Sequence, residues 1–142
     1  MILDPQNTNV KREGNKMNQT NELLEAFRYV DQHFYEMLEE VQTACSFRSV
    51  ASDKAGIEGA ASYILQKMEQ LGMEIQRHNV ENGNPVLLGQ KQGETDKTLF
   101  FYHHYDVVSE GAVDRWISPP FEPAVRDGRI WGRGVSDNKG AL

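Results

Sequence analysis

Two histidines and an aspartate follow directly after a continuous apolar run. The run occupies positions 98–102, and His103, His104 and Asp106 come next. In extended backbone, positions two apart share a face, so His104 and Asp106 point the same way and His103 points the other. A neutral imidazole is a good zinc ligand, and a carboxylate beside it can fix its tautomer. The pattern indicates a metal site that uses one of the two histidines, although a surface ion pair or a turn would explain the same residues.

Further motifs follow in a defined order. They are Trp116-x-x-Pro119-Pro120-Phe121, Asp127-Gly128, Gly132-Arg133-Gly134 and Asp137-x-Lys139-Gly140. Together with His104-x-Asp106-Val107-Val108, this ordered set resembles the signature region of M20 peptidases. That group includes acetylornithine and succinyl-diaminopimelate deacylases, aminoacylases, carnosine-type dipeptidases and glutamate carboxypeptidases. The resemblance extends over positions 23–142, nearly the whole patterned part of the chain.

The resemblance implies a role for three side chains. His104 would bind one metal ion, Asp137 would bridge two ions with its two carboxylate oxygens, and Asp106 would act in catalysis by orienting His104. An anionic bridge relieves the repulsion between two dications, and a water molecule activated by both can attack an amide carbonyl. Zinc is the expected metal, with cobalt or manganese as substitutes. The implied enzyme hydrolyses peptide or N-acyl amide bonds, so its substrate is a small peptide or an N-acyl amino acid.

Two positions depart from the pattern of the family. His103 stands where glycine is common before the ligand histidine, and Ser109 stands where proline is common. Neither change removes a ligand. Binding of the metal by His103 in place of His104 remains an alternative, although the spacing to Asp106 favours His104. Gly132 and Gly134 either allow unusual backbone angles before Asp137 or are ordinary loop glycines.

Two helices are expected to precede these motifs. Apolar residues recur at alternating steps of four and three over positions 23–41, which predicts a helix with one apolar stripe that packs on a domain core. A second helix is predicted over 57–71. Ser52 or Asp53 can cap its start, and Gly72 is the residue type expected just after its end.

Strand signals follow the helices. Positions 73–80 alternate apolar and polar residues, 86–88 resume an apolar segment after a turn, and 98–102 read as a strand covered on both faces. Asp127-Gly128 predicts a tight hairpin. The predicted fold class is α/β, a mixed layered sheet flanked by helices. By resemblance it is the N-terminal part of a di-zinc peptidase catalytic domain.

Composition excludes several classes of function. The 142 residues carry a net charge of −6 and no basic stripe, so nucleic acid and anionic membranes are poor partners. No secretory signal or membrane-spanning run is evident, which favours a cytoplasmic protein. Cys45 is the only cysteine. We expect it to be a buried, inert thiol in a reducing compartment.

The domain organisation is expected to be incomplete. Positions 1–19 are predicted to be a flexible tail, with Met17 as an alternative translation start, and 20–142 a partial metallopeptidase catalytic domain. The catalytic glutamate, the remaining metal ligands and the lid domain, through which many relatives form homodimers, are expected further along. The isolated chain should therefore bind metal weakly and show little hydrolysis. A non-catalytic derivative that acts through association of its first helix is the alternative.

Overall fold

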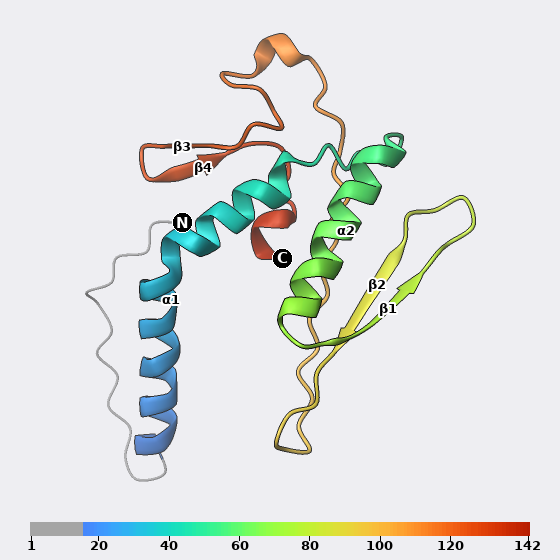
Figure 1. Cartoon of the computed structure of the whole chain (residues 1–142). Helices are drawn as coiled ribbons and strands as arrows, with labels where there is room; N and C mark the ends of the chain where they lie inside the picture. The colour runs from blue at the N-terminus through green and yellow to red at the C-terminus, as the bar shows by residue number, and fades with distance from the viewer. Residues whose placement is uncertain (1–15) are drawn as a thin grey trace. The chain divides into compact units, whose positions relative to one another are not determined.

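The computed structural model describes residues 16–142, so most of the predicted tail lies outside the described residues. Residues 16–19, which composition assigns to that tail, form the start of helix α1 (Lys16–Ser46). The chain divides into two units, residues 1–37 and 38–142. Helix α1 contributes to both units (Figure 1).

The predicted apolar stripe is present along α1. Leu23, Phe27 and Phe34 are each more than half exposed. Among the described residues of α1, only Ala44 and Cys45 are buried apolar residues. These three residues belong to the first unit, whereas the buried apolar residues belong to the second, so packing of the stripe on a domain core stays a prediction. The prediction that Cys45 is buried is confirmed.

Helix α2 (Lys54–Gln70) confirms the second predicted helix together with both of its ends. The Asp53 carboxylate accepts the backbone N–H of Gly56 at 3.0 Å and caps the N-terminus. Gly72, with φ at +68°, takes the left-handed conformation that favours glycine after a helix. The buried face of the helix carries Ile57, Ala60, Ala61 and Ile64.

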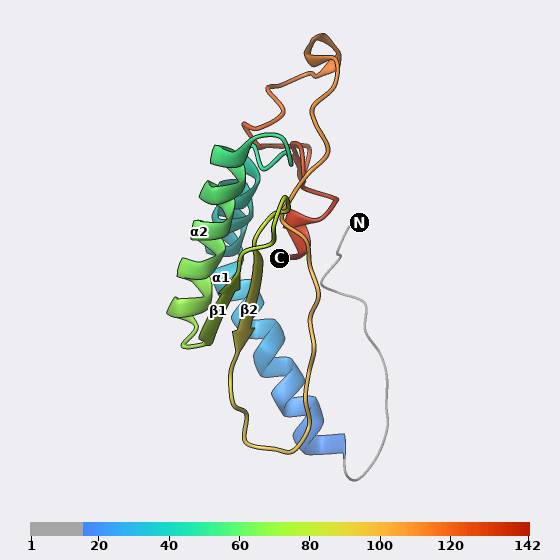
Figure 2. The same ribbon diagram turned by 90° about the vertical axis from the view of Figure 1, so that its right-hand side faces the viewer.

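A two-stranded antiparallel sheet follows α2. Strands β1 (Glu74–His78) and β2 (Val86–Gln90) confirm the two strand segments predicted there, and they pair with each other. The sheet lies beside α2 in both views (Figures 1 and 2). Arg77 of β1 donates to Glu58 of α2 at 2.7 Å. On the other strand, a Cβ at Gly89 would lie 3.1 Å from the sulfur of Met68, so the glycine allows β2 to approach the helix.

The C-terminal part holds short elements. These are the 3-10 helix η1 (Val113–Arg115), strands β3 (Ala124–Arg126) and β4 (Arg129–Trp131), and the 3-10 helix η2 (Lys139–Ala141). Asp127 and Gly128 both have positive φ, at 52° and 68°, which confirms the predicted hairpin turn. Helices and small sheets thus make a mixed α/β fold. Among residues 16–142, no helix is both long and apolar enough to cross a bilayer.

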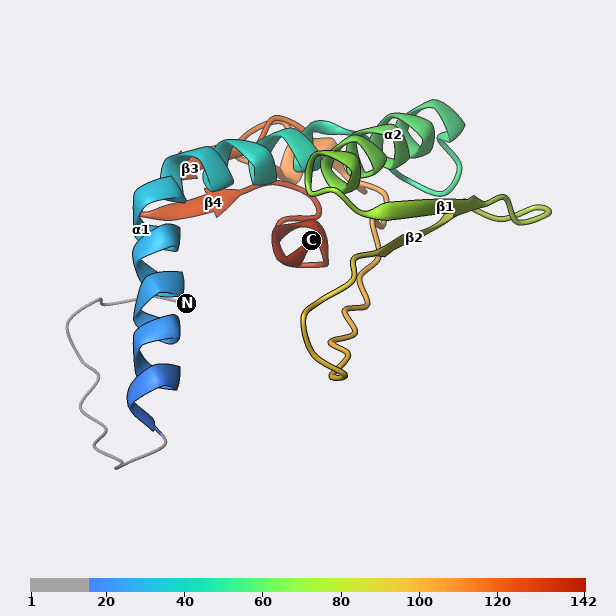
Figure 3. The ribbon, with the colours of Figure 1, turned by 60° about the horizontal axis from the view of Figure 1, so that its bottom comes forward.

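The prediction of a buried strand over 98–102 is wrong in this structure. The segment continues from β2 as chain without assigned strand structure (Figure 3). Its large side chains, from Leu99 to Tyr102, are 75% to 83% exposed. A strand needs a neighbour for its backbone N–H and C=O groups, and none of the described strands pairs with this segment. Without that neighbour, an apolar run suited to a covered strand remains open to solvent.

Candidate metal centre

The segment that carries His104 and Asp106 is held in place by the connection between α1 and α2. Val107 forms an isolated parallel bridge with Val50, and its N–H donates to the carbonyl of Ser49 at 2.9 Å. The hydroxyl of Ser49 donates to the carbonyl of Tyr105 at 2.5 Å. Two hydrogen bonds therefore fix the backbone on either side of Asp106, although the preceding residues 98–102 are unpaired.

Asp137 reaches the same place through a tight turn. Gly134 has a φ of +86°, and a Cβ there would lie 2.9 Å from a methyl carbon of Val107. This confirms the need for glycine at Gly134, whereas Gly132 does not have a positive φ. The N–H of Lys139 donates back to the carbonyl of Gly134 at 2.8 Å and closes the turn around Asp137.

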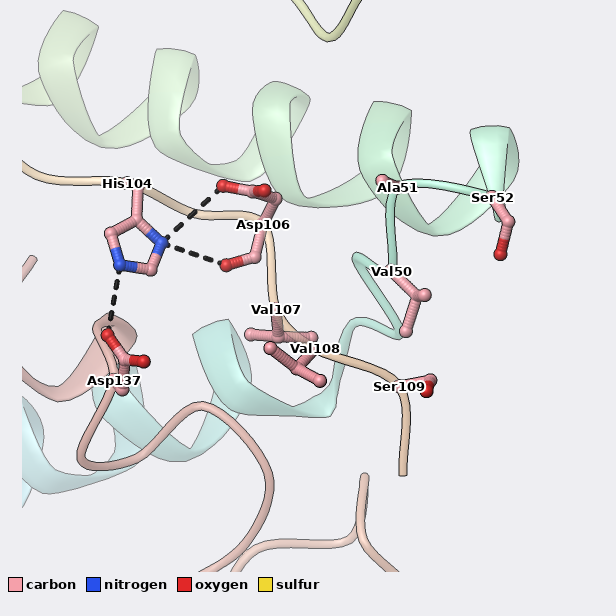
Figure 4. A pocket seen from close by; sticks show the side chains of 9 residues that line it. All are labelled: Val50, Ala51, Ser52, His104, Asp106, Val107, Val108, Ser109 and Asp137. Carbon is pink, nitrogen blue, oxygen red and sulfur yellow. Dashed lines mark hydrogen bonds and ion pairs between the residues drawn. The ribbon is translucent and has the colours of Figure 1, made fainter. Parts of the chain in front are cut away.

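The structure brings His104, Asp106 and Asp137 together. His104 Nε2 lies 3.0 Å from Asp137 Oδ1. On the other side of the ring, His104 Nδ1 lies 3.0 Å from the backbone carbonyl of Asp106 and 3.4 Å from its carboxylate (Figure 4). A ring with both nitrogens engaged has its orientation set. Both ring nitrogens face oxygen acceptors, so the imidazolium donates to both and a neutral ring donates to one of them. Metal binding at Nε2 would require the proton on Nδ1, where the carbonyl of Asp106 can accept it.

The positions of these two donor atoms fit a zinc ion. Two ligands at about 2.0–2.2 Å from one tetrahedral zinc lie roughly 3.4 Å apart, close to the observed separation of Nε2 and Oδ1. The Asp137 side chain is 80% exposed, so its second oxygen is available to another ion. Over residues 16–142, no group of three or more His, Cys, Asp or Glu side chains is placed to hold a metal. The described residues thus bring together two potential donor side chains, His104 and Asp137.

His103 faces a different partner. Its Nδ1 lies 3.1 Å from the side-chain oxygen of Asn138, the residue after Asp137. Both histidines therefore contact the turn 137–138, but only His104 contacts a carboxylate there. The geometry favours His104 over His103 as the ligand. The contact with Asn138 was not expected from the sequence, because no short motif relates residues that are 35 positions apart.

The surroundings raise the pKa of His104 above its ordinary value. The backbone carbonyl of Asp106 is the main cause, the Asp137 carboxylate adds to it, and partial burial acts in the opposite direction. A raised pKa favours the imidazolium, which cannot bind a metal. Protons therefore compete with metal for His104 more effectively than for a free imidazole.

An open cavity of about 460 Å³ lies beside these residues. It is lined by Val50, Ala51, Ser52, His104, Asp106, Val107, Val108, Ser109 and Asp137 (Figure 4). Sequence reasoning did not place 50–52 at the site. Those residues carry no motif and reach the cavity only because the chain between α1 and α2 pairs with Val107. Four of the nine lining residues are small and apolar, and the other five are the two serines and the His104, Asp106 and Asp137 side chains.

Lys139 is the second feature that sequence reasoning missed. It belongs to the Asp137-x-Lys139-Gly140 motif, yet its side chain is buried and donates from Nζ to the carbonyl of Phe47 at 2.7 Å. Burial lowers the pKa of Lys139 to about 8, and nearby Cys45 acts in the opposite direction. A buried amine had no local signal in the sequence, since lysine is normally a surface residue.

The lowered pKa of Lys139 predicts a pH dependence of stability. Between about pH 8 and the ordinary lysine pKa of 10.5, the unfolded chain keeps a proton that the folded chain has released. The free energy of unfolding therefore gains a contribution that increases with pH across this window. We expect the wild-type chain to become more stable relative to Lys139→Met as pH rises from 8 to 10.5. Urea unfolding of both proteins over this pH range tests the prediction. A difference in the free energy of unfolding that does not change with pH would contradict it.

Comparison with known proteins places these residues in context. Residues 100–142 match the profile of peptidase family M20/M25/M40. The match therefore includes His104, Asp106 and Asp137 and all of the ordered motifs.

Three solved structures have similar folds. The dipeptidase Dug1p from Saccharomyces cerevisiae matches over 80% of this chain with a TM-score of 0.70 and 24% identity. The M20 family metallo-carboxypeptidase Sso-CP2 from Sulfolobus solfataricus matches over 74% with a TM-score of 0.69 and 31% identity. Human carnosine dipeptidase 1 matches over 80% with a TM-score of 0.71 and 24% identity. The matched regions are 27%, 24% and 27% of those proteins, so this chain spans about a quarter of their length.

Proposed function

The chain belongs to peptidase family M20/M25/M40, and we propose that it supplies the first metal ligands of a hydrolase that cleaves peptide or N-acyl amide bonds. The observation that carries the proposal is the 3.0 Å contact of His104 Nε2 with Asp137 Oδ1. The Asp106 contacts on the opposite side of the ring support it. These three side chains come from sequence motifs more than thirty positions apart and converge at one cavity.

Each side chain has a distinct task in this proposal. His104 would hold a metal ion through Nε2, and the carboxylate of Asp137 would hold metal beside it. The backbone carbonyl of Asp106 would accept from Nδ1–H of His104, with the Asp106 carboxylate 3.4 Å away, and this would leave the Nε2 lone pair for the metal. Zinc, or cobalt or manganese in its place, would supply Lewis acidity toward the amide carbonyl and make water easier to ionise.

The substrate class follows from the cavity and from the family. The cavity of about 460 Å³ is of the size that binds small molecules, and its valine and alanine walls suit an aliphatic group. Two of the three similar structures are named as dipeptidases and the third as a carboxypeptidase. We propose a dipeptide or an N-acyl amino acid as substrate. In an assembled enzyme, a homodimer is the proposed oligomeric state.

The number of donors limits what this chain does alone. Zinc sites in proteins use three or four protein ligands, and the described residues bring two together. We therefore expect the 142-residue chain to bind zinc weakly and to turn over amide substrates at a negligible rate.

Zinc titration of the chain, followed by the imidazole NMR signals of its histidines, tests the proposal. We expect the His104 signals to respond to Zn²⁺ and those of His33 and His78 to stay unchanged. Because Asp137 supplies the second donor, Asp137→Ala should weaken the response at least roughly tenfold. Glu36→Ala is the matched control, since it removes a carboxylate that also contacts a histidine, at 2.6 Å from His33. A dominant response of His103, or none at His104, would refute the assignment.

Activity is measured separately, on dipeptides and N-acyl amino acids. The 142-residue chain is compared with a version that includes any coding sequence following Leu142. Turnover by the short chain at an ordinary enzymatic rate would contradict the expectation that its two donor side chains are too few for catalysis.

The exposed stripe of α1 favours a second candidate function. Leu23, Phe27 and Phe34 present apolar surface along one helix, which is a common basis for association between helices. A non-catalytic protein acting through this helix would show neither zinc response nor hydrolysis at any chain length. Its apparent mass in sedimentation would instead increase with concentration.

A further inference from the structure

Three consecutive residues, Phe47, Arg48 and Ser49, connect the parts of the candidate metal centre. They follow α1 directly and precede the cap of α2. Each makes a hydrogen bond to a segment far along the chain. We call residues 47–49 the brace.

Ser49 holds the segment of His104. Its hydroxyl donates to the carbonyl of Tyr105, the residue between His104 and Asp106, and its own carbonyl accepts from Val107. Ser49 is fully buried, so no water replaces these contacts. The carbonyl of Tyr105 is part of the peptide group between Tyr105 and Asp106, so its bond to Ser49 orients that peptide group. The carbonyl of Asp106 is the one that His104 Nδ1 contacts.

Lys139 holds the turn of Asp137 to the same brace. Its Nζ donates to the carbonyl of Phe47 at 2.7 Å, and its side chain is 1% exposed. The bond spans 92 positions and joins η2 to the end of α1. Breaking this hydrogen bond would leave a buried amine and a buried carbonyl without partners. Unpaired buried polar groups are costly, so the bond is expected to remain formed.

Arg48 adds a third attachment on the outer side. Its guanidinium donates to both oxygens of Glu110 at 3.0 Å and to Asp53, the cap of α2, at 3.1 Å. The segment after Asp106 is thereby tied to the start of α2. This part of the brace is more exposed, and its bonds are more weakly protected from solvent than those of Ser49 and Lys139.

We propose that Ser49 and Lys139 are positioning residues that set the separation of His104 and Asp137. The inference rests on the proposed function, because it assigns the brace a purpose in metal binding. Neither side chain touches the two ligand atoms. The Ser49 hydroxyl bonds the segment of His104, and Lys139 bonds the turn of Asp137 to the carbonyl of Phe47. Both attachments lie within three consecutive residues, so one short piece of chain sets the distance between the ligands.

Zn²⁺ affinity of brace variants tests the proposal. Ser49→Ala and Lys139→Met remove one donor each at nearly unchanged volume. We expect each to weaken Zn²⁺ binding at His104 by about tenfold or more, as loss of a group that orients a ligand does. Ser46→Ala and Lys67→Met are matched controls, since Ser46 bonds only Thr43 and Lys67 bonds Glu40, away from the site. Both controls should keep the wild-type affinity.

A metal-free measurement separates this inference from the proposed function. Asp137→Asn should shift the His104 imidazole signals at fixed pH in the wild-type background, because the two side chains are in contact. In the Ser49→Ala and Lys139→Met backgrounds, the same substitution should shift them much less. The β1–β2 amide signals report whether each variant is folded, and Ser49→Ala decides the matter if Lys139→Met does not fold.

The outcomes point to different conclusions. An unchanged Zn²⁺ affinity, or an unchanged effect of Asp137→Asn, in folded brace variants overturns the positioning role. If the wild-type chain shows no Zn²⁺ response but the effect of Asp137→Asn is lost in the brace variants, the positioning role stands and the metal proposal fails.

Discussion

Replacement of Gly56 by alanine is expected to cost about 3 kcal/mol or more of the free energy of unfolding, at the high end for an overpacked site. Gly56 lies in the first turn of α2, and a Cβ there would overlap the backbone carbonyl oxygen of Arg48. The oxygen belongs to the brace, so neither side of the contact is a flexible side-chain end. The overlap can be relieved only if α2 or the brace moves.

Urea unfolding followed by circular dichroism measures this cost. Gly93→Ala is the matched control, because a Cβ at Gly93 would meet no atom within 4 Å and its φ is not positive. The control should unfold at the wild-type urea concentration or slightly above it. If Gly56→Ala were equally stable, α2 would not approach Arg48 as closely as the structure has it.

The second large effect is expected at the exposed run 98–102. Phe100→Ser combined with Phe101→Ser should raise the concentration at which the chain self-associates by at least roughly tenfold, since burial of each phenylalanine is worth about 2 kcal/mol. Both rings are more than 70% exposed in an extended segment with unpaired backbone. Apolar segments of this kind recruit further chains.

Light scattering at a series of protein concentrations tests this expectation. Ile117→Ser is the control: Ile117 is 87% exposed but stands alone in a loop. It should change the association little. Equal effects of the two variants would show that association depends on total exposed apolar surface rather than on the run 98–102.

Local chemistry allowed much of the fold to be predicted. Asp53 caps α2 because a short carboxylate reaches the free N–H groups of the first turn, and Gly72 ends the helix because it tolerates positive φ. Asp127 and Gly128 form the hairpin turn for a similar backbone reason. Each of these features depends on a few neighbouring residues, so a single sequence contains the necessary information.

The features that sequence reasoning missed depend on distant partners. The run 98–102 has the composition of a covered strand, but a strand exists only where a neighbour accepts its hydrogen bonds. The ligand candidates His104 and Asp137 were predicted through a family resemblance, and the structure brings them together. Ser49 and Lys139 had no such signal, because their importance lies in bonds to backbone carbonyls 56 and 92 positions away.

These long separations also imply an order of folding. Helix α2 and the β1–β2 hairpin need only nearby residues and can form early, whereas loop closure over 56 and 92 positions is slow. During synthesis, the brace leaves the ribosome long before Lys139 does. The hydrogen bond between Lys139 and the carbonyl of Phe47 can therefore form only after nearly all of the described residues have been synthesised. Among the described residues, the candidate metal centre therefore takes shape after α2 and the β1–β2 hairpin.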